Sequence, residues 1–182
     1  EIIPIEPDAD NAAAGIASTI VMVCEAVSIP YRLFKYANRG TSANDNSMRY
    51  LCVLTIAGSD SCGGAGVQAD IKTMSALGVY AASAITSVTV QNTLGVNAIQ
   101  AIEPAIVAGQ IKAVMDDVKP VAIKIGMVND CATIHAIADS LSSYSPSTLV
   151  VDPVMVSTSG SMLMQRDALE VFCSELLPMA TL

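Results

Sequence analysis

The stretch between Ala57 and Asp70 constrains the fold of this chain more than any other. It reads Ala-Gly-Ser-Asp-Ser-Cys-Gly-Gly-Ala-Gly-Val-Gln-Ala-Asp and contains four glycines: Gly58, Gly63, Gly64 and Gly66. Residues 50–56 before it are apolar and rich in β-formers, which predicts a buried strand, and residues 67–77 after it have apolar side chains at helical spacing. The stretch is therefore predicted to be a strand-to-helix turn whose glycines let the backbone bend sharply and approach a ligand.

The free backbone amides at the start of this predicted helix favour an anion or the polar edge of a ligand. A P-loop requires a lysine where Gly64 stands, so that motif is set aside. The dinucleotide fingerprint matches residues 64–69, but the acid expected about 20 residues later is missing from residues 81–92. A dinucleotide-binding oxidoreductase therefore stays open as the weaker interpretation of the loop.

Strand and helix patterns alternate from residue 48 onward. Strands are predicted near 51–56, 80–90, 96–102, 122–125 and 148–151, and helices near 67–77, 104–117, 130–141 and 167–176. This order predicts an α/β fold with a mostly parallel sheet and helices on both faces. Ligands of such sheets bind beyond the carboxyl ends of the strands, where four candidate positions fall: Gly58 to Asp60, Gln91, Met127 and Asp152.

The first 47 residues form a separate unit of the sequence, interpreted as an extension and linker of unknown role. A helix is predicted over residues 12–27, capped by Asp10-Asn11. It is shorter than a membrane span requires and follows acidic residues, so a buried or partner-packed helix is preferred to a span or a signal peptide. Residues 40–47 are polar and predict a linker to the main domain, residues 48–182.

Charge and cysteine content limit the partners and the compartment. The formal net charge of −8 argues against nucleic acid or an anionic membrane surface, because both attract basic patches. The five cysteines are scattered and the single histidine is His135, so neither a zinc site nor a disulfide framework is expected. The chain is therefore expected in a reducing, cytoplasmic compartment, and Cys62 is interpreted as a loop residue without a nucleophilic role.

Several separated motifs occur in a distinctive order, and together they resemble one family. They are Thr55-Ile-Ala-Gly-Ser-Asp60, Gly63-Gly-Ala-Gly-Val-Gln-Ala-Asp70, Gln91-Asn-Thr93, Lys124-Ile-Gly-Met127 and Val151-Asp-Pro-Val154. Over residues 48–182 the chain resembles the amino-terminal half of the hydroxymethylpyrimidine/phosphomethylpyrimidine kinases of the ribokinase-like superfamily. The resemblance implies phosphorylation of 4-amino-5-hydroxymethyl-2-methylpyrimidine and its monophosphate in thiamine biosynthesis, with ATP as co-substrate and Mg²⁺, and it suggests a homodimer.

The resemblance also implies a pyrimidine-binding site made by Gly58, Asp60, Ala65, Asp70, Gln91, Met127 and Val154. The amide of Gln91 can donate and accept together, which matches the edge of an aminopyrimidine, and Met127 and Val154 would pack against the ring. Asp152 is expected near Mg²⁺ and the phosphates of ATP. For Asp70 a solvated charge at a helix start is the alternative, and for Asp152 a capped turn. Lys124 is left out of the site because it alternates with the apolar Ile123 and Ile125.

Catalytic motifs that the resemblance implies are missing from the sequence. Neither a Gly-Thr-Gly-Cys-like loop nor an Asn-x-x-Glu motif occurs, and the sequence stops at Met179-Ala-Thr-Leu182, where a further strand is expected to start. The expectation is therefore a truncated ribokinase-like domain that holds the substrate half and is inactive by itself. A pyridoxine or pyridoxal kinase and a non-catalytic pyrimidine-binding module remain as alternatives.

Overall fold

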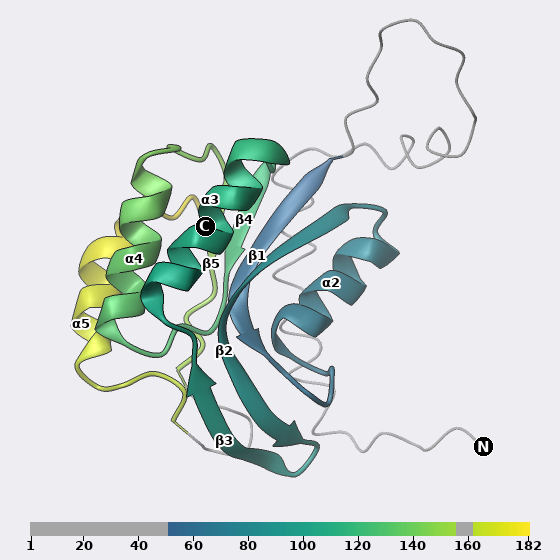
Figure 1. Ribbon diagram of the computed structural model, residues 1–182, viewed down its shortest axis with the longest axis vertical. Coiled ribbons are helices and arrows are strands. Elements are labelled where there is room, and N and C mark those ends of the chain that lie inside the picture. Colours follow the sequence, from purple (N-terminus) through teal and green to yellow (C-terminus); the bar gives the residue numbers. More distant parts are fainter. Residues whose placement is uncertain (1–50, 156–161) are drawn as a thin grey trace, which may run out of the picture.

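The computed structural model describes residues 51–155 and 162–182. The helix predicted over residues 12–27, the linker over 40–47 and the polar loop over 157–161 lie outside these ranges. The described residues are drawn in colour in Figure 1.

A five-stranded sheet forms the centre of the fold, in the order β3-β2-β1-β4-β5. The central strand β1 (Cys52–Ser59) pairs in parallel with β2 (Tyr80–Asn92) on one side and with β4 (Ala122–Ile125) on the other. Strand β5 (Leu149–Val151) extends the parallel part, and β3 (Gly95–Ala101) forms an antiparallel hairpin with β2. The predicted mostly parallel sheet is confirmed.

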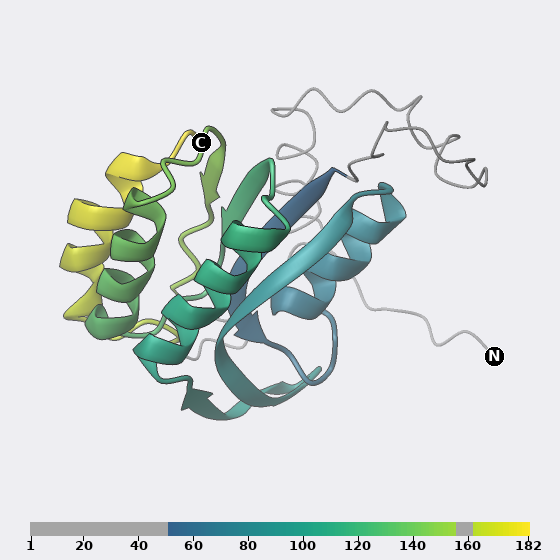
Figure 2. The ribbon, with the colours of Figure 1, turned by 45° about the horizontal axis from the view of Figure 1, so that its top comes forward.

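Helices cover both faces of this sheet, as the alternating pattern predicts. Helix α2 (Gly66–Ala76) lies on one face, whereas α3 (Pro104–Asp117), α4 (Cys131–Ser142) and α5 (Ala168–Val171) lie on the other (Figure 1). The turned view in Figure 2 shows the same separation, with the sheet between α2 and the other helices. Helix α4 begins where the sequence predicts, because the Asp130 carboxylate accepts the N–H of Thr133 as an N-cap.

The last helical segment runs further than the sequence predicts. Helix α5 continues through a π-helical turn (Phe172–Leu176) into a 3₁₀ turn (Leu177–Met179) that includes Pro178. Thr181 N–H then donates to the carbonyl oxygen of Leu149 at 2.7 Å, and Val151 N–H donates to that of Leu182 at 3.0 Å. The final residues thus hydrogen-bond to the backbone of β5.

Side-chain alternation along the strands divides the core into two layers. The larger layer lies under α3, α4 and α5 and includes Leu54, Ile56, Ile123, Ile125 and Phe172. The smaller layer lies under α2 and includes Val53, Met74, Val79, Ala122 and Val150. Because successive residues of a strand point to opposite faces, Lys124 shares the α2 face with Ala122. The α2 side of the sheet therefore receives one charged residue from an otherwise apolar strand.

The turn between β1 and α2 depends on a close backbone contact. Gly66 has a φ of +55°, and a Cβ atom added to it would lie 2.2 Å from the carbonyl oxygen of Gly58. Only a residue without a side chain fits there, both for its backbone conformation and for the space available. This contact sets how closely the first turn of α2 approaches the end of β1.

We expect the substitution Gly66→Ala to lower the free energy of unfolding by about 3 kcal/mol or more, because it combines left-handed strain with a backbone clash. The matched control is Gly109→Ala in α3, where an added Cβ meets nothing within 4 Å. Alanine in that helix is expected to raise stability by about 0.5–1 kcal/mol. Urea unfolding of the three proteins tests this, and equal stabilities of the two variants would contradict it.

Candidate functional site

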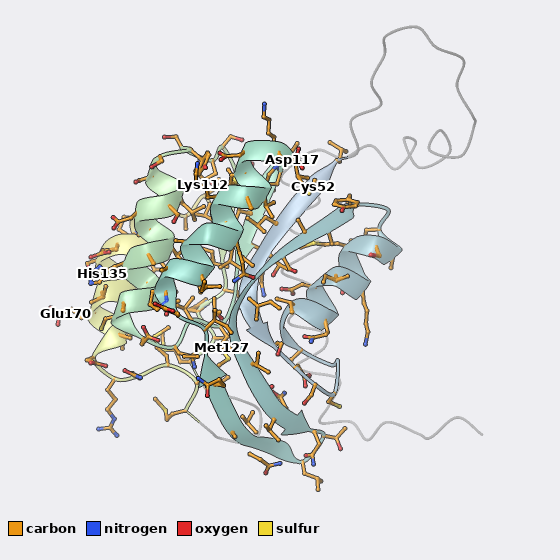
Figure 3. All side chains as sticks on the ribbon, in the orientation of Figure 1. Cys52, Lys112, Asp117, Met127, His135 and Glu170 are labelled. Carbon is orange, nitrogen blue, oxygen red and sulfur yellow. The ribbon has the colours of Figure 1, made fainter. Side chains whose placement is uncertain are left out.

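The carboxyl ends of β1, β2, β4 and β5 bring the positions predicted from the sequence to one edge of the sheet. In Figure 3 Met127 lies at this edge, near the base of the β2–β3 hairpin, whereas Cys52 marks the opposite end of β1. Gly58, Gln91 and Asp152 end or directly follow the neighbouring strands. The pattern-based prediction of one strand-end edge is therefore confirmed.

Met127 is held against the end of the central strand. A Cβ atom on Gly58 would lie 3.3 Å from the sulfur of Met127 and 2.7 Å from the Ser87 hydroxyl oxygen, so the bare glycine makes room for both. The hydroxyl of Thr86 donates to the carbonyl oxygen of Met127 at 2.8 Å. The Ser87 hydroxyl is buried without a hydrogen-bond partner among the described residues. Gly58 and Met127, both predicted site residues, are thus direct neighbours.

Asp60 organises the glycine-rich loop from inside. Its carboxylate accepts the backbone N–H groups of Cys62, Gly64 and Ala65 at 2.8, 2.9 and 2.8 Å. The expectation that the amides at the start of the helix are free to bind an anion is wrong for Gly64 and Ala65, because a carboxylate of the chain itself already takes that place. The contacts to substrate predicted for Asp60 and Ala65 stay predictions.

The loop is also fastened to the end of β2 beside Gln91. The Ser61 hydroxyl donates to the carbonyl oxygen of Gln91 at 2.7 Å and accepts the N–H of the same residue at 3.0 Å. The side chain of Gln91 is half-buried. Its amide oxygen lies 3.2 Å from the hydroxyl oxygen of Thr89. Gln91 therefore has a fixed backbone and an amide that can reach a ligand.

A buried ion pair joins α2 to β4 beneath the edge. The ammonium nitrogen of Lys124 lies 3.2 and 3.4 Å from the two carboxylate oxygens of Asp70, and the Thr55 hydroxyl donates to the same carboxylate. The side chain of Asp70 is 0% exposed and that of Lys124 is 3% exposed. The alternative interpretation of Asp70 as a solvated charge is wrong. A direct contact of Asp70 with substrate stays a prediction, and the structure gives its carboxylate partners inside the protein.

Lys124, which the sequence pattern led us to leave out of the site, lies close to two of the predicted site residues. Its alternation with Ile123 and Ile125 is confirmed. The side chain is buried, and its nitrogen also lies 3.9 Å from the Asp152 carboxylate. An added Cβ on Gly126 would lie 2.7 Å from that nitrogen, which explains the glycine in Lys-Ile-Gly. A lysine within a short apolar strand was the available signal, because a buried ammonium requires a carboxylate partner.

Asp152 and Val154 follow β5 at the same edge. Asp152 N–H donates to the carbonyl oxygen of Ile125 at 2.9 Å, and Val154 N–H donates to that of Asp152 at 2.8 Å. The Asp152 side chain is 25% exposed, so its carboxylate faces both Lys124 and solvent. Across residues 51–155 and 162–182 no group of three His, Cys, Asp or Glu side chains gathers as a metal site. Asp152 could therefore supply one carboxylate ligand to a cation, and other ligands would have to come from elsewhere.

Two hollows lie away from these residues. One of about 390 Å³ is lined by β3, the start of α4 and residues 162–166. The other, of about 550 Å³, lies at the opposite end of the sheet beside Cys52, Tyr80 and Val118. Burial raises the pKa of the Cys52 thiol there, which disfavours its reactive thiolate. In the described part of the chain, no helix combines the length and apolarity needed to cross a membrane.

Comparisons with known proteins find relatives in both sequence and fold. The sequence model of the phosphomethylpyrimidine kinase family matches residues 60–182. The hydroxymethylpyrimidine/phosphomethylpyrimidine kinase of Rhizobium meliloti is 55% identical over 127 residues, covering 70% of this chain and 47% of that protein. The crystal structure of phosphomethylpyrimidine kinase from Clostridium difficile is similar with a TM-score of 0.68 and 50% identity, covering 71% of this chain and 56% of that one. An ADP complex of Bacillus subtilis pyridoxal kinase gives a TM-score of 0.63 at 30% identity, covering 72% and 48% of the two chains.

The fold and the strand-end site thus define a ribokinase-like α/β protein, related to the pyrimidine and pyridoxal kinases. Within that class the chain belongs to the phosphomethylpyrimidine kinase family. It spans about half the length of the curated hydroxymethylpyrimidine/phosphomethylpyrimidine kinases that it matches.

We expect Lys124→Met to lower the free energy of unfolding by about 3–5 kcal/mol, because it leaves the carboxylate of Asp70 buried without a cation. Adding Asp70→Asn to that variant is expected to recover part of the loss, since no buried charge then remains at the pair. Urea unfolding of the four proteins of this double-mutant cycle measures the coupling.

The control for this cycle is Lys112→Met. Lys112 forms an exposed i,i+4 pair with Asp116 at 2.7 Å, where solvent screens the charges, so its loss should leave stability unchanged. If the Lys124 and Lys112 substitutions lower the free energy of unfolding equally, the buried pair contributes no more to stability than the exposed pair.

Proposed function

We propose that this chain provides the substrate-binding part of a kinase that phosphorylates the hydroxymethyl group of 4-amino-5-hydroxymethyl-2-methylpyrimidine and then its monophosphate. ATP is the phosphoryl donor, and the reaction belongs to thiamine biosynthesis. The relatives that carry this name and match at 44–55% identity support the assignment. The single structural observation that carries it is the Gln91 amide at the strand-end edge.

Gln91 supplies the polar recognition in this proposal. Its backbone is fixed to the loop through Ser61, and its amide is partly accessible. An amide offers a donor and an acceptor side by side, which an aminopyrimidine matches with its ring nitrogen and exocyclic amine. The amides of Gly64 and Ala65 are occupied by Asp60, so a side chain is better placed than the loop backbone to read this edge.

Apolar contact comes from Met127 and Val154 in this proposal. The thioether of Met127 lies against Gly58, the residue as a whole is 8% exposed, and Val154 is half-buried after β5. A polarizable sulfur packs well against an aromatic ring. Gly58, Asp60 and Ala65 complete the proposed site by shaping the loop beside it, and Asp70 contributes by holding Lys124 in place.

Asp152 is the proposed contact to Mg²⁺ and to the phosphates of ATP. The observation that fits is a partly exposed carboxylate, since Mg²⁺ is commonly held by one or two carboxylates together with phosphate oxygens and water. Such an ion would neutralise negative charge on the transferred phosphoryl group. The ammonium nitrogen of Lys124, 3.9 Å from the Asp152 carboxylate, orients that carboxylate from the buried side.

The compartment and the assembly are part of the same proposal. The four cysteines of the described residues have free thiols, which supports the reducing cytoplasm as the compartment. A homodimer is proposed from the family resemblance alone.

A second candidate is phosphorylation of pyridoxal or pyridoxine. The solved structures of pyridoxal kinases that resemble this chain, at TM-scores of 0.61–0.63, favour it as the runner-up. Their identities of 30–32% lie below the 50% of the phosphomethylpyrimidine kinase structure. The pyrimidine is therefore preferred.

We expect calorimetric titration of the chain to show saturable binding of the aminopyrimidine and weaker binding of pyridoxine and NADH. Gln91→Ala should weaken pyrimidine binding by about tenfold or more, because two polar atoms of the ligand lose their partner. The control is Gln100→Ala on β3, whose exposed amide has the neighbouring Ala101 carbonyl oxygen as its hydrogen-bond partner among the described residues.

Other results of this titration assign other functions. Pyridoxine binding tighter than pyrimidine binding would favour the pyridoxal kinase, and NADH binding would favour the dinucleotide-binding interpretation. A folded chain that binds none of the three would contradict the proposed site.

We also expect the 182-residue chain to transfer no phosphoryl group by itself, because the catalytic motifs implied by the family resemblance are missing from its sequence. The measurement is ADP release from Mg-ATP in the presence of saturating pyrimidine. ADP formation above the background rate, abolished by Asp152→Ala, would show that the chain is catalytically sufficient. Pyrimidine binding without turnover even beside the rest of a family kinase would instead favour a non-catalytic binding module.

A further inference from the structure

The hydroxyl of Thr89 occupies an unusual position between two oxygen atoms. Thr89 lies on β2 and is 4% exposed. Its oxygen is 2.7 Å from the backbone carbonyl oxygen of Ser59, the last residue of β1, and 3.2 Å from the Gln91 side-chain oxygen. One buried hydroxyl thus connects the start of the glycine-rich loop to the amide that is proposed to read the pyrimidine.

These two contacts cannot both be donated by Thr89. A hydroxyl carries one hydrogen but can accept two, and a backbone carbonyl oxygen only accepts. The contact to Ser59 has the usual O–H···O length, so the proton belongs there. The oxygen and nitrogen of a glutamine amide have nearly the same shape, and their assignment follows from the hydrogen-bond network. Satisfying all three groups requires the amide to be turned, so that its nitrogen donates to Thr89.

We propose that Thr89 is a positioning residue that locks the Gln91 amide with its nitrogen toward Thr89 and its oxygen toward the ligand. The proposal rests on the proposed function and adds to it the direction in which the ligand edge is read. In this arrangement one N–H of Gln91 donates to Thr89 and the Thr89 hydroxyl donates to the carbonyl oxygen of Ser59, so each contact has one proton. The amide then presents one acceptor and one remaining N–H in a fixed order.

This fixed order selects between two closely related pyrimidine edges. The 4-amino pyrimidine donates from its exocyclic amine and accepts at the adjacent ring nitrogen. The 4-oxo analogue has the reverse pattern, since its exocyclic oxygen accepts and its ring N–H donates. A freely turning amide would pair with either edge, whereas a locked amide leaves the wrong edge with two unpaired polar contacts. Thr89 would therefore give the site its preference for the amino form.

The test is a titration of the chain with 4-amino-5-hydroxymethyl-2-methylpyrimidine and with its 4-oxo analogue. Thr89→Val keeps the shape and removes the hydroxyl, and the matched control Thr89→Ser keeps the hydroxyl. We expect the wild-type preference for the amino form to fall by about five- to tenfold in the valine variant, the effect of one lost hydrogen bond. The serine variant should keep the preference within about twofold.

A second measurement needs no ligand and no variant. In the wild-type chain, nuclear Overhauser contacts are expected between the side-chain amide protons of Gln91 and the methyl group of Thr89. Their absence would overturn the lock even where the pyrimidine binds, and would leave the proposed function intact.

The titration separates the two proposals in the same way. If the folded Thr89→Val variant keeps the wild-type ratio of amino to oxo affinity, the positioning role alone is overturned. This holds whether both affinities are unchanged or both fall by the same factor. Binding of neither pyrimidine by the wild-type chain overturns the proposed function and this inference with it.

Discussion

The close contact between Gly66 and the carbonyl oxygen of Gly58 is the constraint on which the site edge depends. It lets α2 begin directly against the end of β1, with no side chain between them. The loop that makes this turn would leave several N–H groups without partners, and the Asp60 carboxylate satisfies three of them. The turn is therefore both tight and internally satisfied, and it presents a defined surface at the carboxyl ends of the strands.

A buried charge network supports this edge from below. Lys124 would be costly in an apolar strand by itself, and Asp70 would be costly in the buried face of α2. Each compensates the other, and Thr55 adds a hydrogen bond to the carboxylate. Because the ammonium also lies near Asp152, the network connects α2, β4 and the residues after β5. The positions of three separate segments are thereby coupled through one lysine.

The distribution of free polar groups decides how a ligand can be recognised. A glycine-rich loop before a helix usually offers its amides to an anion. Here the Asp60 carboxylate accepts those amides, and in the proposed function a ligand is recognised by side chains at the edge, Gln91 above all. Thr89 and Ser61 hold this residue by its amide and by its backbone. In the proposed function, a loop that resembles a phosphate-binding turn therefore serves a neutral heterocycle.

Local patterns in the sequence were sufficient for most of the architecture. The strand and helix order from residue 51 onward, the parallel sheet and the edge that carries Gly58, Gln91, Met127 and Asp152 all follow from hydrophobic periodicity and from the rules of α/β topology. The last helix, predicted to end near residue 176, instead continues past Pro178, because a proline is tolerated in the first turn of a new 3₁₀ segment. Helices, strands and turns depend mainly on residues that are close in the sequence, so the sequence alone can predict them.

By itself, then, the sequence determined the kind of fold, the family resemblance and the place of the candidate site. Only the tertiary structure decided what the polar side chains do there: that Asp60 caps its own loop, and that Asp70 is buried against Lys124. The reason is distance along the chain. Asp70 and Lys124 are separated by 54 residues, and their pairing depends on which strand lies under α2 and which face each side chain takes. Hydrophobic periodicity predicts which apolar residues are buried. The partner of a buried charged residue depends on the order of the strands and is known only from the tertiary structure.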